Sequence, residues 1–260
     1  MSKYWLVFRL SLLDILEYRV DNILRLFRYV IMVTFVMMLW IAVSKETTQL
    51  NTTANELVIY YLFSAIVYGL SNYHLDYVEE DIRLGHISKF LLKPISPFWY
   101  YFFHEAATAL FDITIKSLVL IPLLWFLGYT FQVSWLSLSL FLIYLPLIFY
   151  TTFSIYFGLS TLGFWLTQVE SIRMSVLFIG RYLSGIFIPA LFFPDFFQKI
   201  LWWLPFSHYA FTPIQIIKNQ LSFPDGLRGL GILITWMLVF TIFRVIIWRL
   251  ATHSYESTGI

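Results

Sequence analysis

Residues 135–159 read WLSLSLFLIYLPLIFYTTFSIYFGL and contain no charged side chain. A helix that crosses a bilayer needs roughly 20 consecutive, mostly apolar residues, so this stretch is long enough to span. Other charge-poor stretches meet the same requirement: 26–44, 56–75, 108–127, 172–193 and 229–248. We therefore expect an all-α integral membrane protein with six transmembrane helices.

The composition agrees with this interpretation. Hydrophobic residues make up 60% of the chain and charged residues 12%, whereas soluble domains have about 25% charged residues. We expect residues 1–260 to form one membrane domain. The chain has no cysteine, which excludes disulfides and thiolate metal sites. It also lacks the Walker A, HExxH and GxSxG motifs. We therefore expect no catalytic residues, no metal ligands and no cofactor in this chain, and transport rather than catalysis.

The N-terminal segment is amphipathic. Its polar residues recur in steps of three and four: Ser11, Asp14, Glu17, Asp21, Arg25 and Arg28. The leucines between them fall mainly on the other side, which is the period of an amphipathic helix. We expect residues 1–25 to form a helix that lies in the plane of the membrane interface.

The placement of Lys and Arg predicts the topology, because cytoplasmic loops carry an excess of both. One side of the predicted membrane has Lys3, Arg9, Arg19, Arg25, Arg28, Arg83, Lys89, Lys93, Arg173, Arg244 and Arg249. The opposite side has fewer: Lys45, Lys199, Lys218 and Arg228. We expect a multi-pass protein with both termini in the cytoplasm.

The segment 195–222 differs from the predicted spans. It contains two tryptophans and two prolines: Trp202, Trp203, Pro205 and Pro213. Neither half is long enough to span, so we expect two short helices, broken at 204–206, that lie on or re-enter the outer face. Bent backbone at membrane depth is tolerated only when it is buried in protein or lines a cavity.

Charged residues inside predicted spans cost free energy and need a reason. Asp112 and Lys116 are four residues apart and share a helical face, either as a polar lining of a translocation path or as a self-neutralising pair. Arg181 lies about 12 Å into the fifth stretch, counted at 1.5 Å per residue. It either pairs with a carboxylate such as Glu170 or Asp112, or meets an anionic group of a substrate. Pro189 is expected to kink the same helix.

One long loop, 76–97, has mixed charges and five apolar residues able to anchor a partner: Ile82, Leu84, Ile87, Phe90 and Leu91. Its part DIRLGHISKFLLKPISP, at 81–97, resembles the loop DIRxGxLxxxLLxPxSP of the ABC-2 type permease subunits of bacterial ABC transporters. SGIFIPALFFP at 184–194, followed by Leu-Pro-Phe at 204–206, also resembles that family. YESTG at 255–259 is similar to the family's tail RRYxxxGG, but lacks the basic pair and one glycine.

The resemblance implies that the N-terminal helix is a cytoplasmic connecting helix, and that loop 76–97 docks on a separate ATPase subunit. The coupling residues it implies are Asp81, Ile82, Arg83, Leu84, Gly85, His86, Ile87, Phe90, Leu91, Lys93 and Pro94. The segment 195–222 would cap the exit, with an outer gate at Trp202, Trp203, Pro205 and Phe206. A second permease, identical or paralogous, and two ATPase subunits that hold ATP and Mg²⁺ would complete an exporter of a hydrophobic or amphiphilic substrate. The resemblance places this assembly in the bacterial plasma membrane, in contact with lipid and not with nucleic acid.

Other functions stay open. A related permease would carry a lipid-linked saccharide along an aromatic-lined path. An intramembrane enzyme that modifies lipid would need an acid, base or nucleophile set, for which His104, Glu105 and Asp112 are the candidates. A membrane scaffold or immunity protein would show no flux and no transport-stimulated ATP hydrolysis.

Overall fold

A computed structural model describes residues 2–46, 53–71, 75–126, 128 and 132–254, and in these ranges the chain is helical without strands. The α-helices are α1 Ser2–Glu17, α2 Arg19–Glu46, α3 Ala54–Tyr68, α4 Asp76–Arg83, α5 Ser88–Leu91, α6 Pro97–Phe126, α7 Trp135–Ser160, α8 Glu170–Leu183, α9 Asp195–Trp203, α10 Phe211–Ile217 and α11 Phe223–Ser254. Short 3-10 helices lie between them: η1 Thr161–Phe164, η2 Ala190–Phe192 and η3 Phe206–His208. The all-α prediction is confirmed. The tail at 255–259 lies outside the described residues.

Four helices of the described ranges are long and apolar enough to cross a membrane: Val20–Val43, Pro97–Phe126, Trp135–Phe164 and Phe223–His253. The two other predicted spans contain shorter helices, α3 with 15 residues and α8 with 14. At 1.5 Å per residue these measure about 22 and 21 Å, less than the roughly 30 Å of a hydrocarbon core. Six crossings therefore stay a prediction.

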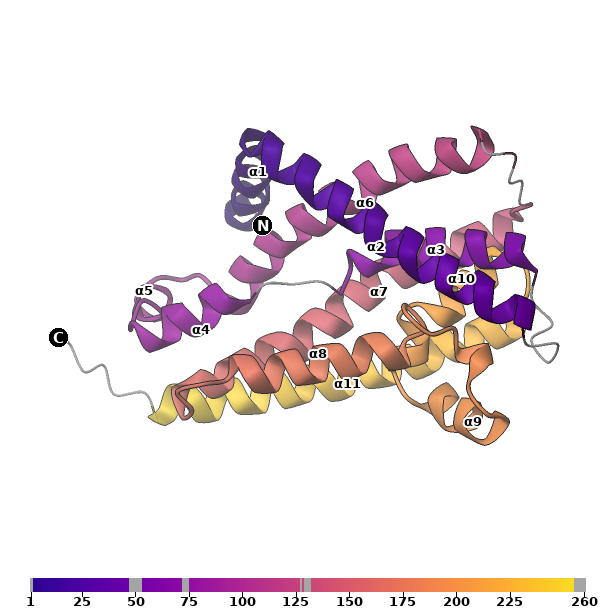
Figure 1. The fold of residues 1–260 in the computed structure, drawn as a ribbon. Coiled ribbons are helices and arrows are strands. Elements are labelled where there is room, and N and C mark those ends of the chain that lie inside the picture. Colours follow the sequence, from indigo (N-terminus) through magenta and orange to yellow (C-terminus); the bar gives the residue numbers. More distant parts are fainter. Residues whose placement is uncertain (1, 47–52, 72–74, 127, 129–131, 255–260) are drawn as a thin grey trace.

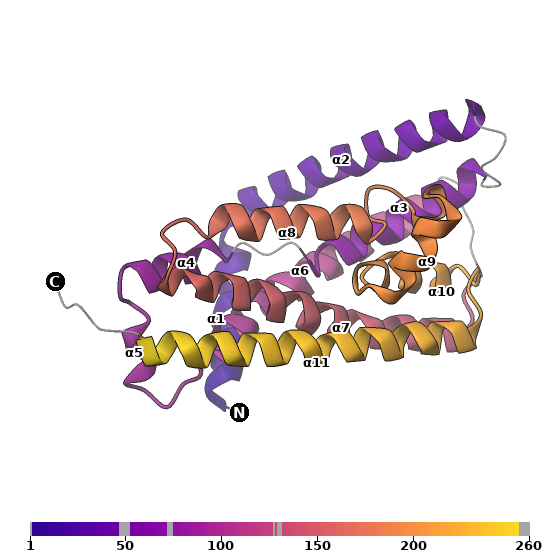
Figure 2. The same ribbon diagram turned by 90° about the horizontal axis from the view of Figure 1, so that it is seen from below.

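Two ends of the helix bundle can be distinguished in Figure 1. We call the end that carries α4 and α5 the loop end, and the opposite one the α9 end. α1 and the last turn of α11 lie on the half of the molecule nearest the loop end (Figures 1 and 2). This arrangement puts the N-terminal helix and the end of the last helix on the same side as the long loop.

α1 lies across the long axis of the other helices (Figure 2). The helix ends at Glu17, and Tyr18 separates it from α2, so the predicted amphipathic helix over 1–25 is shorter than expected. Tyr4 joins α1 to the start of α6, because its hydroxyl accepts a hydrogen bond from the Ser96 N–H (3.0 Å) and its ring stacks on Phe103. The orientation of α1 and the exposed leucines on it fit a helix that lies at a membrane interface.

α6, α7 and α11 form an aromatic core. Phe98 and Phe102 of α6 lie 5.3 and 5.4 Å from Phe153 of α7, measured between ring centres. α7 and α11 pack along much of their length (Figure 2). At Gly158 of α7 an added Cβ atom would lie 2.9 Å from the Phe243 ring and 3.5 Å from the Arg244 Cα of α11. Small residues let helix backbones approach in this way in membranes.

α8 ends inside the bundle, two residues before Gly185, whose φ of +93° lies in the region that favours glycine. The helix thus stops before Pro189 instead of being kinked by it. Side chains of α2 and α3 donate hydrogen bonds to three consecutive carbonyls: Tyr60 to Gly185 (2.7 Å), Ser64 to Ile186 (3.1 Å), and Tyr61 and Trp40 to Phe187 (3.0 and 2.8 Å). Backbone groups without a partner are costly in apolar surroundings, so these donors stabilise the helix end.

The segment 195–222 contains the short α-helices α9 and α10, with η3 between them. α9 ends at Trp203, and the chain turns at Pro205 before η3. The Trp203 carbonyl accepts a hydrogen bond from the Trp236 indole of α11 (2.9 Å), and α10 packs against α7 and α3. These contacts hold the segment against α11, α7 and α3. Its entry into a membrane stays a prediction.

Candidate functional site

The loop at the loop end consists of α4 and α5, joined by a turn in which Gly85 has a φ of +74°. The Asp81 carboxylate accepts hydrogen bonds from the Tyr101 hydroxyl (2.5 Å) and the Lys89 ammonium (2.9 Å), and His86 Nδ1 lies 3.4 Å away. Partial burial opposes ionisation of Asp81, but the hydrogen bonds from Tyr101 and Lys89 outweigh it and lower the pKa of Asp81. The carboxylate is therefore charged at neutral pH and ties the loop to α6.

Three of the apolar loop residues expected to anchor an ATPase instead pack into the chain's own core. Ile82, Ile87 and Phe90 are buried. The expectation that these side chains face a partner is therefore corrected: α4 and α5 are amphipathic, and their apolar faces pack on neighbouring helices. Leu84, with 53% of its surface exposed, does face outward, and so does Leu92, with 86% exposed.

The outer loop surface is consequently small and basic. It consists of the exposed residues after Ile82, namely Arg83, Leu84, His86, Lys89, Leu92, Lys93 and Pro94. Asp76 and Glu80 of the same loop are also exposed and line a separate groove. A depression of about 620 Å³ lies in it, between His86 and Lys93. Leu91 belongs to α5, but its side chain lies outside the described part of the structure. Sequence reasoning missed Leu92, although its position beside Lys93, at the end of α5, placed it next to predicted coupling residues.

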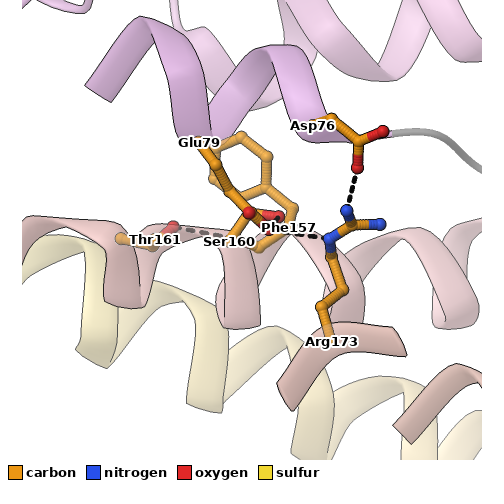
Figure 3. A network of polar contacts seen from close by, with 6 residues as sticks. All are labelled: Asp76, Glu79, Phe157, Ser160, Thr161 and Arg173. Atoms are coloured by element: carbon orange, nitrogen blue, oxygen red, sulfur yellow. Dashed lines mark hydrogen bonds and ion pairs between the residues drawn. The ribbon is translucent and has the colours of Figure 1, made fainter. Parts of the chain in front are cut away.

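Arg173 joins this loop to the bundle (Figure 3). Only 1% of its side chain is exposed; its Nε donates to Glu79 Oε1 (2.7 Å), and its guanidinium also pairs with Asp76. The Ser160 hydroxyl donates to the same Glu79 oxygen (3.3 Å). α4 is thereby fastened to α8 and to the end of α7. From the sequence, Arg173 indicated only the topology. The spacing of Asp76 and Glu79, three residues apart in the loop, was a signal for a cation between them.

A groove of about 930 Å³ separates α4 from residues 163–171. Its described lining includes four carboxylates: Asp76, Glu79, Glu80 and Glu170. Arg173 neutralises part of this charge, and Arg83 stands at the groove wall. Trp165 and Leu166 are partly exposed on the opposite wall. An acidic groove with apolar side chains suits a basic, amphipathic segment of another protein.

The three charges predicted inside the membrane meet around Tyr68. Lys116 and Asp112 form an ion pair, with 2.5 Å between Nζ and Oδ2. The Lys116 ammonium lies 3.8 Å from the Tyr29 ring centre and 5.5 Å from that of Tyr68. The Arg181 guanidinium carbon lies 4.8 Å from the Tyr68 ring centre. The structure thus brings together residues of α2, α3, α6 and α8 that the sequence could only treat separately.

This geometry bears on both interpretations of the charges. The direct contact of Lys116 with Asp112 is that of a self-neutralising pair, and both residues also line a cavity of about 370 Å³. Glu170 is not placed to pair with Arg181, because it begins the same helix about 16 Å away along the axis. A role of Asp112, Lys116 and Arg181 in lining a pathway stays a prediction.

The candidate enzyme residues share the wall of that cavity. The Tyr77 hydroxyl donates to Glu105 Oε1 (2.5 Å), and His104 Nδ1 lies 3.7 Å from the same oxygen. Burial, and then the Glu105 charge, raises the pKa of Tyr77, which keeps this hydroxyl protonated. The described residues include no group of three or more His, Cys, Asp and Glu side chains that could hold a metal ion.

The four predicted gate residues do not form one surface. Trp203 is 70% exposed and Pro205 is buried. The Trp202 ring lies 5.2 Å from that of His208, and Phe206 packs near Tyr209. A gate at this place stays a prediction.

A comparison with known protein families shows to which family the chain belongs. Residues 29–259 match the family described as ABC-2 family transporter protein. The match covers most of the chain and includes the loop, the ion-pair network and the α9 end, so the chain belongs to the ABC-2 transporter family. It is the membrane component of an ABC transporter, a multi-pass permease rather than a catalytic subunit. A search of curated proteins finds no significant match.

Proposed function

We propose that the chain is the permease subunit of an ATP-driven exporter of a hydrophobic or amphiphilic substrate. A second permease, identical or paralogous, completes the membrane pathway, and two separate ATPase subunits bind ATP and Mg²⁺. We place the protein in the bacterial plasma membrane with both termini in the cytoplasm. The position of α1 and of the last turn of α11 near the loop end supports this topology (Figure 1).

The observation that carries the proposal is the firm attachment of a loop with a free outer surface. α4 and α5 bury their apolar faces and are fastened by Arg173 and Asp81. The outer loop surface presents Leu84 and Leu92 among basic side chains. Exposed apolar residues in a charged rim are typical of protein interfaces.

The same attachments supply a route for coupling. A displacement of α4 by the ATPase is passed to α8 through Arg173 and to α6 through the Asp81–Tyr101 hydrogen bond. These two helices carry Arg181 and the Asp112–Lys116 pair. Movement of the loop therefore changes the spacing of the charged groups around Tyr68, which is the step we assign to ATP binding.

Co-purification with co-expressed ATPase subunits tests the proposal. We expect Leu84→Asp combined with Leu92→Asp to abolish co-purification, because two charges replace the exposed apolar contacts. Gln220→Asp is the matched control, since it adds a charge at an exposed position near the α9 end. The ATP hydrolysis rate of the purified complex gives a second readout.

Two results would contradict the proposal. Retention of the ATPase by the double variant would show that the outer loop surface is not the docking site. Failure of the unchanged chain to bind any ATPase subunit, in several detergents, would favour the scaffold or the lipid-modifying enzyme.

A further inference from the structure

A cavity of about 370 Å³ lies between α2, α3, α4 and α6. Its charged side chains are three acids and three bases: Asp21, Arg25, Arg28, Glu105, Asp112 and Lys116. The formal charges of these six side chains sum to zero. A cavity of this kind suits a ligand that carries both signs.

Two of the three opposite-charge pairs are closed within the protein. Lys116 is bound to Asp112 at 2.5 Å and is nearly fully buried. Arg25 is bound to Asp21 at 3.2 Å and donates to the Asn22 amide oxygen at 3.1 Å. These four charges satisfy one another and leave little attraction for a ligand.

Arg28 and Glu105 are different. Among the described residues, no carboxylate lies within 4.0 Å of an Arg28 nitrogen. Glu105, with 8% of its side chain exposed, has no Lys or Arg nitrogen within that distance in the described ranges; its contacts are Tyr77 and His104. A buried carboxylate without a cation and a cation without a carboxylate thus line one cavity. Glu105 is buried and therefore gains most from a cationic partner, whereas Arg28 is exposed and is open to an anionic group.

Apolar surface adjoins the Arg28 side of the cavity. Ile23, Leu24 and Phe27 lie on α2 beside the arginines, and each is more than half exposed. An amphiphile can therefore place its headgroup in the cavity and its hydrocarbon chain along α2. The cavity reaches from the first turns of α2 and from Tyr77 of α4, at the loop end, to the middle of α6.

We propose that this cavity binds the phosphoethanolamine headgroup of a membrane lipid, with the phosphate at Arg28 and the ammonium between Glu105 and the Tyr77 ring. The lipid enters from the leaflet at the loop end and is a substrate of the exporter, so this role rests on the proposed function. Arg28 recognises the phosphate by charge-assisted hydrogen bonds, and Glu105 and Tyr77 recognise the ammonium by an ion pair and a cation–π contact.

Native mass spectrometry of the purified full chain tests the site directly. The probes are phosphatidylethanolamine, phosphatidylglycerol and water-soluble glycerophosphoethanolamine. We expect preference for phosphatidylethanolamine over phosphatidylglycerol, and about tenfold weaker binding after Arg28→Gln, the effect of losing one hydrogen bond to a charged group. Glu105→Gln should weaken phosphatidylethanolamine and remove the preference. Arg228→Gln, at an exposed ion pair elsewhere on the chain, should leave binding unchanged.

Several outcomes would overturn the inference. Equal binding by the unchanged chain and Arg28→Gln would exclude the phosphate contact. Equal affinity for the two lipids would exclude recognition of the ammonium. Binding of glycerophosphoethanolamine as tight as that of the lipid would make the ligand a soluble phosphodiester. The assay contains no ATPase, so its failure leaves the permease assignment to be judged by co-purification alone.

Discussion

At the loop end the helices are joined by ion pairs, whereas at the α9 end neutral side chains donate hydrogen bonds to backbone carbonyls. Arg173 holds α4 through Glu79 and Asp76 at the first end. At the other, Tyr60 and Tyr61 are two of the side chains that hold the carbonyls after α8. Both sets of contacts attach a short helix to its neighbours. Ion pairs do so at the loop end, and hydrogen bonds from neutral side chains do so at the α9 end.

The difference follows the access of water. Asp76 is 58% exposed and stays hydrated, so only Arg173 and Glu79 of the ionic cluster lose most of their contact with water. The carbonyls after Gly185 lie among buried aromatic residues, where an added charge would be expensive. Neutral donors satisfy these carbonyls without that cost.

Removal of Arg173 should have the largest effect. Arg173→Ala leaves Glu79 without its cation and is expected to lower the free energy of unfolding by about 3 kcal/mol. Thermal unfolding in detergent measures it, and increased proteolysis between α4 and α5 should accompany it. Arg228→Ala, which removes an arginine that is 76% exposed, is the control and should cost less than about 1 kcal/mol. Similar values for the two variants would contradict the role of Arg173.

A side chain at Gly185 should have an intermediate effect at the α9 end. In Gly185→Ala the new Cβ atom would lie 2.6 Å from the Tyr60 hydroxyl, and the φ of +93° strains any L residue. We expect a loss of about 2 kcal/mol in the free energy of unfolding. Gly231→Ala is the control, since nothing lies within 4 Å of its added Cβ and alanine favours a helix. Equal stability of Gly185→Ala and the unchanged chain would show that the break after α8 is not held as described.

Loss of one neutral hydrogen bond should have the smallest effect. Tyr60→Phe removes the donor to the Gly185 carbonyl and is expected to cost about 1 kcal/mol. Tyr182→Phe, at a half-exposed ring of α8, should change the unfolding free energy by less than about 0.5 kcal/mol. If Tyr60→Phe cost as much as Arg173→Ala, the two ends would not differ in the way their chemistry indicates.

The loop shows how far sequence reasoning reached. Its length, its charges and its place between predicted spans all pointed to a docking element, and that role stays a prediction. The prediction that Ile82, Ile87 and Phe90 face a partner was wrong, because these side chains are buried in the chain's own core. An apolar residue in a loop can pack either against a partner protein or into the chain's own core. Only the packing of α4 and α5 on neighbouring helices distinguishes these two possibilities.

The charged residues of the spans show a second limit. The spacing of Asp112 and Lys116 predicted their shared face, because four residues make about one helical turn. The approach of Arg181 to Tyr68 joins two helices far apart in the chain. No periodicity within one helix contains that information.

By itself the sequence determined the all-α membrane class, the long apolar helices at 135–159 and 229–248, the breaks around Pro205 and the family. These properties depend on local composition, since a bilayer admits long apolar segments as helices and proline interrupts them. Only the tertiary structure decided where α8 ends, which loop residues face outward, and that Arg28 and Glu105 share a cavity. These depend on contacts between distant segments, because the free energy of a buried carbonyl or charge is set by the partners that folding brings to it.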